Sequence, residues 1–277
     1  MSAFSNRDTR FLEEMGIGPL WVRRDAPEIP AMPEMSTAQE NRVEPAASAA
    51  SASSAAPAPS AVSIPGTQPE SAVVRSDDAV PAPADVQRMN WTELRAAVAG
   101  CTKCGLCRNR NNTVFGVGDE RAKWLFVGEG PGRNEDLQGE PFVGPAGKLL
   151  DNMLLAMGLK RGENTFIANI VKCRPTDPNG RDRPPASEEA AACMPYLERQ
   201  IALIQPTVIV ALGKTAALSL LGLDPATPVS KLRGTVHRYA GRPLIVTYHP
   251  AYLLRTLTDK KKAWADLCLA MSTYAKA

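Results

Sequence analysis

The sequence KWLFVGEGPGRNED, residues 123–136, joins a short apolar run to a glycine-rich loop. An apolar run of this length that ends in glycine is typical of a strand buried within a sheet. Three further apolar runs follow at 164–172, 207–213 and 243–249. We expect these four runs to be the strands of one sheet.

Helical patterns separate the predicted strands. We expect helices at 146–158, 187–204, 214–222 and 261–274, the second of which begins with a Ser cap and acidic residues and contains Pro195. Alternating strands and helices predict an α/β fold, a three-layer αβα sandwich with a central, mostly parallel four-stranded sheet. Ligands of such sheets bind at the carboxyl ends of the strands. The loops GEGPGRNED, NIVKCRP and HPAYLLR fall there.

The composition divides the chain into three segments. Residues 1–27 are mixed and include aromatic and aliphatic side chains, whereas residues 28–85 are rich in Ala, Pro and Ser. Such a composition buries too little apolar surface to offset the entropy lost on ordering. We therefore predict a short mixed segment at 1–27, which a resemblance described below makes docking-peptide-like, a disordered linker at 28–85 and a globular domain at 86–277.

Charge is distributed unevenly along the chain. Residues 1–90 contain 7 Arg, no Lys and 12 acidic residues, which leaves a net charge of +8 on the remainder. A basic domain suits a polyanion such as DNA, although an ordinary solvated surface explains the charge equally well. No apolar run approaches the roughly 18 residues that span a bilayer, and the N-terminus lacks an apolar signal core. We expect a cytoplasmic protein without membrane attachment.

Six cysteines in a chain with no export signal indicate metal binding or catalysis rather than disulfides. Cys101 and Cys104 form a C-x-x-C pair, Cys173 follows a predicted strand, and Cys193 lies twenty residues later. Four thiolates can hold zinc or an iron–sulfur cluster, and the spacing does not choose between them. Cys107 extends the pair and is a rival ligand, and free buried cysteines remain an alternative.

Two further features of the sequence, the segment LGKTA and the two histidines, are candidate functional motifs. The segment LGKTA at 212–216 looks like the end of a P-loop, but the first glycine of that motif would fall at Val208, which excludes it. The chain has two histidines. His237 lies in a plain alternation, whereas His249 ends an apolar strand and begins the odd loop HPAYLLR.

Residues 101–274 resemble the family 4 uracil-DNA glycosylases of the uracil-DNA glycosylase superfamily. The resemblance rests on GEGPGRNED, PFVGPAG, NIVKCRP, LGKTA, SKLRG and HPAYLLR, which occur in the family's order and nearly its spacing. It implies a monofunctional enzyme that flips uracil from DNA and hydrolyses its N-glycosidic bond, leaving an abasic site for base excision repair. It also implies a [4Fe–4S] cluster, structural in role, whose ligands are Cys101, Cys104, Cys173 and Cys193. Cys107 is then not a ligand.

The resemblance also implies roles for pocket residues. Phe142 falls where the family stacks an aromatic ring on the flipped uracil, and Asn169 where an amide reads the O4/N3 edge and separates uracil from cytosine. His249 matches a histidine near uracil O2, where a donor would stabilise charge in the transition state. Glu129 falls on the pocket carboxylate. Superfamily members with a strong water-activating Asp place it at the position of Gly130, so we expect no single indispensable base.

The resemblance also indicates further residues of the pocket and of the DNA-contacting surface. Glu135, whose expected role is to exclude the methyl group of thymine, and Asp136 are additional pocket candidates. Leu253 or its neighbour Leu254 is the expected wedge that fills the vacated base stack. The candidate phosphate contacts are Arg255, Lys231 and Arg233. The loop between Cys173 and Cys193 is slightly long for the family, and we expect it to bulge at the surface.

Residues 5–24 resemble the N-terminal peptide of the psi subunit of the bacterial clamp loader. That peptide docks on the chi subunit, so the resemblance implies that this leader binds the chi subunit of the DNA polymerase III clamp loader. Trp21 would be its aromatic anchor. Chance similarity of a short pattern is the alternative.

Three other functions are alternatives to a catalytic glycosylase. A non-catalytic DNA-binding or replication accessory module on the same fold need not retain the pocket residues Glu129, Phe142, Asn169 and His249. The second is a superfamily branch that binds uracil-containing DNA covalently and carries a histidine-containing insertion. At the same place this chain has CRPTDPNGRDRPP, residues 173–185, which contains no histidine. A zinc-stabilised DNA-binding domain is the third. We expect a monomeric enzyme that acts on uracil-containing DNA.

Overall fold

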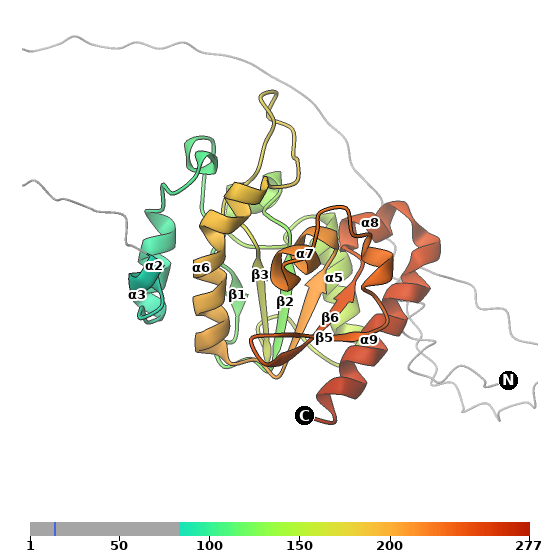
Figure 1. The fold of residues 1–277 in the computed structure, drawn as a ribbon. Coiled ribbons are helices and arrows are strands. Elements are labelled where there is room, and N and C mark those ends of the chain that lie inside the picture. The colour runs from blue at the N-terminus through green and yellow to red at the C-terminus, as the bar shows by residue number, and fades with distance from the viewer. Residues whose placement is uncertain (1–13, 15–82) are drawn as a thin grey trace, which may run out of the picture. The chain divides into compact units, whose positions relative to one another are not determined.

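The computed structural model describes residue 14 and residues 83–277. Residues 83–277 form a six-stranded sheet with helices on both of its faces (Figure 1). The predicted docking segment at 1–27, Glu14 apart, and the predicted linker up to residue 82 lie outside the described residues. The first described element of this domain, α2 (Pro83–Val86), begins just before the predicted boundary at residue 86.

Four parallel strands form the centre of the sheet, whose order is β1-β3-β2-β4-β6-β5. The parallel strands are β2 (Trp124–Gly128), β3 (Thr165–Asn169), β4 (Val208–Leu212) and β6 (Arg242–Thr247). They are the four predicted strands, with ends that differ from the prediction by up to three residues. Because helices cover both faces, these strands are buried on both sides, which explains their continuous apolar sequences.

The sheet has two more strands than predicted. β1 (Val117–Gly118) pairs antiparallel with β3, and β5 (Val236–Tyr239) pairs antiparallel with β6. β1 is too short to produce an apolar run. β5 is an edge strand whose residues alternate between exposed and half-buried positions, so its sequence lacks the signal of a buried strand.

Two groups of helices complete the three predicted layers (Figure 1). One face is covered by α3 (Trp91–Ala99), α6 (Ser187–Ile204) and α7 (Lys214–Leu221). The other is covered by α5 (Pro145–Ala156), α8 (Pro250–Arg255) and α9 (Lys260–Tyr274). Strand residues alternate between the two cores: Leu125 and Val127 pack into the first, Trp124 and Phe126 into the second. α6 continues through Pro195, as predicted.

Several short elements were not predicted, because one or two turns leave no helical periodicity to read. They are α2, η1 (Gly105–Arg108), α4 (Arg133–Gln138), α8, η2 (Val229–Lys231) and η3 (Leu257–Asp259). α4 begins directly after the loop that follows β2. Within the described part of the chain, no helix has both the length and the apolar character needed to cross a membrane.

Candidate active site and cysteine cluster

The predicted pocket residues meet at the carboxyl ends of the parallel strands. Glu129 follows β2, Asn169 ends β3, and His249 follows β6; together with Phe142 they line one pocket. Residues 130–135, which include Gly130 and Glu135, also line the pocket, as do residues 144–146. The fold therefore brings together residues that are up to 120 positions apart in the sequence.

Asn169 presents an unsatisfied polar atom in this pocket. The residue is only 2% exposed, and its Oδ1 has no hydrogen-bond partner among the described residues. A buried amide oxygen without a partner is costly unless a ligand supplies a donor. Gly128 makes room for it, since a Cβ at residue 128 would lie 2.4 Å from Asn169 Oδ1 and 2.6 Å from the Phe142 ring. The arrangement is suited to a planar ligand with a donor on its edge.

Phe142 has an unusual backbone conformation. Its φ angle is 57°, in the left-handed region that bulky L-residues rarely adopt. Its ring stacks beside the imidazole of His249, with 5.5 Å between centroids and 29° between planes. The backbone packs tightly against α5, because a Cβ at Gly147 would lie 1.7 Å from the Phe142 carbonyl oxygen. The aromatic ring is thus held at the pocket wall.

Glu135 lines the pocket, but its carboxylate is occupied by backbone groups. Oε1 accepts hydrogen bonds from the amides of Val143 and Gly144, each at 3.0 Å, and Oε2 accepts from Gly132 at 3.2 Å. Its observed contacts therefore hold the loop around Phe142 rather than reach into the pocket. The other predicted acid, Asp136, does not line the pocket at all.

The imidazole of His249 is poised as a neutral donor. His249 is the N-cap of α8, and its Nδ1 accepts a hydrogen bond from the Ala251 amide at 3.1 Å. Burial, with the nearby charge of Arg255, lowers the pKa of His249 to about 4. A neutral imidazole carries one proton, and because Nδ1 accepts, that proton sits on Nε2. His249 can therefore donate from Nε2 at neutral pH.

Glu129 has a partner that the sequence analysis did not identify. The hydroxyl of Thr215, at the start of α7, donates a short hydrogen bond to Glu129 Oε2. Thr215 belongs to the LGKTA segment, so this segment supports the pocket carboxylate instead of binding a phosphate. Gly213 in the same segment has a φ of 95° and lets the chain pass close to His249.

The candidate DNA-contacting residues at the rim of the pocket differ in how exposed they are. Leu253 is fully buried in the core between α8 and the sheet, whereas Leu254 is 42% exposed. Insertion of Leu253 into DNA would require unpacking the core, so of the two wedge candidates only Leu254 is accessible. Lys231 and Arg255 are exposed.

Arg233 was predicted as a phosphate contact, and in the structure its guanidinium is engaged within the domain. Its Nε donates to Asp266 at 2.7 Å, one terminal nitrogen donates to the Lys262 carbonyl at 2.6 Å, and its guanidinium lies over the Tyr248 ring. Asp266 is almost completely buried. Removing Arg233 from this pair to bind a phosphate would leave a buried carboxylate without its partner.

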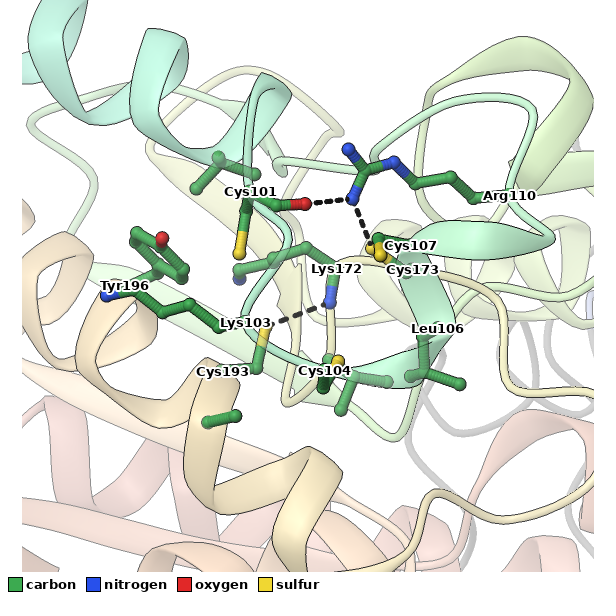
Figure 2. Close-up of a pocket in the computed structure, with 13 residues that line it drawn as sticks. Cys101, Lys103, Cys104, Leu106, Cys107, Arg110, Lys172, Cys173, Cys193 and Tyr196 are labelled. Atoms are coloured by element: carbon green, nitrogen blue, oxygen red, sulfur yellow. Dashed lines mark hydrogen bonds between the residues drawn. The ribbon is translucent and has the colours of Figure 1, made fainter. Parts of the chain in front are cut away.

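A second site is a hollow lined by cysteines. Five cysteines face it, together with apolar side chains such as Val98 and Leu106. Figure 2 shows these side chains around the hollow; they are Cys101, Cys104, Cys107, Cys173 and Cys193. In the described residues, no three His, Cys, Asp or Glu side chains are arranged to hold a single metal ion. Cys268, half-buried on α9, does not line the hollow.

The thiols of the hollow are suited to a cationic ligand. Burial raises the pKa of Cys104, Cys173 and Cys193, the last to about 12. A nearby metal would stabilise the thiolates that burial disfavours. Two donors already point at the sulfurs: the Lys172 amide at 3.3 Å from Cys193 Sγ, and Arg110 Nη1 at 3.2 Å from Cys173 Sγ (Figure 2). Such hydrogen bonds are typical of sulfur ligands of a metal cluster.

Two networks connect the cysteine hollow to the pocket. The buried ammonium of Lys172 donates to the Asn169 carbonyl at 2.9 Å and to Gln200 Oε1 at 2.7 Å. Asp136, fully buried, accepts from both the amide and the side chain of Asn111, which follows the first cysteines. Lys172 therefore links the cysteine site to the pocket residue Asn169, and Asp136 links the segment after the first cysteines to α4.

Arg110, Lys172 and Thr215 are site residues that were not predicted from the sequence. Arg110 continues the three-residue spacing of Cys101, Cys104 and Cys107, which is the one signal that could have identified it. The positions of Lys172 and Thr215 depend on pairings between distant segments.

The loop between Cys173 and Cys193 projects from the domain, as predicted (Figure 1). Residues 178–182 are exposed, and a bridge between Thr176 and Asp182 closes the loop. Pro175, Asp182 and Arg183 from its base also line the pocket. The projecting loop thus flanks the opening of the pocket.

Comparison with known proteins places these features in a family context. The model of the uracil DNA glycosylase superfamily matches residues 115–268. A type-4 uracil-DNA glycosylase from Archaeoglobus fulgidus is 47% identical over 163 residues, which are 57% of this chain and 79% of the relative. The corresponding enzymes from Thermotoga maritima and Sulfurisphaera tokodaii are 46% and 45% identical, over 59% and 58% of this chain and 82% and 74% of their own lengths.

Proposed function

Because this chain belongs to the type-4 uracil-DNA glycosylases, we propose that it extrudes uracil from DNA and hydrolyses the N-glycosidic bond, without cutting the strand. The product is an abasic site for base excision repair. A base stacked in a duplex is out of reach of an enzyme pocket, so the nucleotide must leave the stack first.

The observation that carries this proposal is the unpartnered Oδ1 of Asn169. Uracil presents an N3–H donor beside its O4 acceptor, and an asparagine amide offers the matching acceptor and donor. Cytosine has an unprotonated N3 and an amino group at the same edge, so it would place an acceptor against the buried Oδ1. The pocket therefore favours uracil over cytosine, with Phe142 stacking on the ring face.

His249 and Glu129 act on the reacting centre in this proposal. Cleavage of the bond leaves negative charge on uracil O2, and the Nε2–H of the neutral His249 donates to that charge as it develops. Glu129, fixed by Thr215, holds the attacking water and stabilises the positive charge on the sugar. A glycine at residue 130 provides no second carboxylate, so electrostatic stabilisation outweighs base catalysis.

The cysteine hollow would hold a [4Fe–4S] cluster through Cys101, Cys104, Cys173 and Cys193. The thiols line one hollow, and burial disfavours their free thiolates, which supports a metal cluster there. When bound, the cluster supplies structural cross-links between three chain segments. The networks through Lys172 and Asp136 then transmit that order to the pocket.

The exposed residues at the rim would engage the DNA. Leu254 fills the gap that the extruded nucleotide leaves in the stack, and Arg255 and Lys231 contact phosphates. The domain's net positive charge supports a polyanionic partner.

A labelled duplex with one U:G pair tests the activity. The full chain is incubated with this duplex, and half of the product is then treated with alkali. We expect intact strands before alkali and a single break at the uracil afterwards, because the pocket lining contains no lysine nucleophile. Breaks before alkali would refute monofunctional hydrolysis, and no breaks after alkali would refute the activity.

The leader is proposed to have a separate function. Residues 5–24 would dock on the chi subunit of the DNA polymerase III clamp loader and carry the enzyme to replicating DNA. The support is the pattern of aliphatic and aromatic residues that ends in Trp21.

A further inference from the structure

We propose that Arg161 is a positioning residue that holds the ring of Phe142 in place for the extruded uracil. The inference rests on the proposed stacking role of Phe142. Arg161 lies in the turn between α5 and β3 and does not line the pocket. Its effect on the reaction would be transmitted through the backbone of residues 141–142.

The conformation of Phe142 requires an external constraint. A φ of 57° places a bulky L-residue in a region that it rarely occupies. Such conformations persist only where the surrounding structure over-determines them, and they concentrate at functional sites.

Arg161 supplies this constraint through a fork of donors. One terminal nitrogen donates to the carbonyl of Pro141 at 3.0 Å, and the other donates to the carbonyl of Phe142 at 2.9 Å. The planar guanidinium fixes the direction of two successive carbonyl groups, which restrains the two peptide planes on either side of the Phe142 Cα and hence its φ and ψ angles. Nε donates to Asp151 Oδ1 at 2.8 Å, so the guanidinium is itself held in orientation.

The other contacts of the loop around Phe142 come from residues of the pocket wall. Glu135 accepts from the amides of Val143 and Gly144, and Gly147 allows close packing beneath Phe142. Both of these residues belong to the loop and helix that build the pocket wall. Arg161 is the contact that can be removed while every pocket-lining side chain remains.

Loss of Arg161 would release the two carbonyls. The backbone of Phe142 would then relax toward negative φ, and the ring would leave its position beside His249. The chemistry at His249 and Glu129 stays intact, but the base loses its stacking surface in the ground state and the transition state alike.

A double-mutant cycle on the full chain tests this inference. Arg161→Gln, Phe142→Ala and the double variant are compared for kcat/KM on uracil-containing DNA and for inhibition by free uracil. We expect Arg161→Gln to lower kcat/KM and weaken uracil inhibition by about tenfold, within the range of one base–aromatic stack. In the Phe142→Ala background the same change should have little further effect.

Two controls separate positioning from general stability. Arg161→Lys keeps the charge beside Asp151 but cannot span both carbonyls, so an intermediate loss is expected. Arg242→Gln removes a comparable arginine–carbonyl bond, to Pro206 at 2.8 Å, at the opposite ends of the strands. It should change thermal stability without changing uracil inhibition.

The outcomes distinguish this inference from the proposed function. If Arg161→Gln has the same effect with and without the Phe142 ring, Arg161 does not act through Phe142 and the inference is wrong. If Phe142→Ala leaves uracil inhibition unchanged, the stacking role fails and the inference fails with it. Failure of the wild-type chain to release uracil would instead refute the activity itself.

Discussion

His249 illustrates how one side chain is prepared by its surroundings. The hydrogen bond from the Ala251 amide to Nδ1 places the proton on Nε2, and burial lowers the pKa to about 4. Because the pKa is lowered, the neutral form persists as pH falls from 8 to 5, and the imidazolium forms only as pH falls through about 4. The donor is therefore the neutral imidazole.

This charge state predicts a flat pH profile. The single-turnover rate of uracil release should show no histidine titration between pH 5.5 and 8, and His249→Ala should lower the rate by about 10²–10³. His237→Ala is the matched control, since the other histidine bonds to the Leu232 carbonyl and lies outside the pocket. A step near pH 6.5 that disappears in His249→Ala would contradict the neutral donor.

Asn169 predicts the base preference. Asn169→Asp replaces the amide nitrogen with a second oxygen, which can accept from the amino group of cytosine but cannot donate to uracil O4. We expect the ratio of uracil to cytosine release to fall or reverse. Competition between U:G and C:G duplexes in one reaction measures it. An unchanged ratio would remove Asn169 from base reading.

Among the structural elements, the end of β3 and the residues that follow it connect the two sites. Within five consecutive positions they include Asn169, the buried Lys172 and the cysteine Cys173. The Asn169 carbonyl accepts from Lys172, whose own amide donates to Cys193. Order in the cysteine hollow therefore bears on the strand end that is proposed to read the base.

The cysteine hollow predicts different consequences for different thiols. Cys173→Ala should lose iron and lower the melting temperature, because removal of one ligand opens a four-thiolate site. Cys107→Ala should retain iron, although Cys107 faces the same hollow. Iron analysis and absorbance near 400 nm on anaerobically purified protein measure both.

Cys268→Ala is the matched control for these variants, since Cys268 does not line the hollow. It should keep its iron. Equal loss of iron from the Cys107 and Cys173 variants would show that the ligand set is different from the one proposed. Zinc in place of iron in the wild-type protein would refute the cluster.

For the whole molecule, the division of charge and composition predicts separable functions. The first 90 residues are net acidic and the remainder net basic. We expect glycosylase activity to reside in the domain that begins near residue 83, while the leader would recruit a partner. A tethered domain searches nearby DNA at a raised effective concentration.

The leader is tested with the full chain, Trp21→Ala and a deletion of residues 1–82. Calorimetry should show binding of the chi subunit by the full chain, and both changes should abolish it, because a buried aromatic anchor carries much of the energy of a small interface. Both should release uracil from naked oligonucleotides at the wild-type rate. Val43→Ala, in the predicted linker, should affect neither property.

Two results would contradict this division. Absence of chi binding by the full chain at high micromolar concentration would refute the docking role. Loss of catalysis on deletion of residues 1–82 would show that the leader is part of the folded enzyme.

The amino-acid sequence was sufficient to predict the four central strands and that Glu129, Phe142, Asn169 and His249 lie together. Strands covered on both faces need continuous apolar runs, and these runs are local signals. Loops at the carboxyl ends of parallel strands meet at one edge of the sheet, which brought Glu129, Asn169 and His249 together as expected.

Other features depended on contacts between segments far apart in the chain. The edge strand β5 lacks an apolar run, because one side of it is solvated. The burial of Leu253 rather than Leu254 follows from how α8 rotates against the core, and Arg233 is occupied by Asp266, thirty-three positions away. The hydrogen bonds from Arg161 to the carbonyls of Pro141 and Phe142 likewise join residues that are distant in the sequence. Such pairings leave no periodic pattern in the sequence, because packing in three dimensions selects the partner of each side chain.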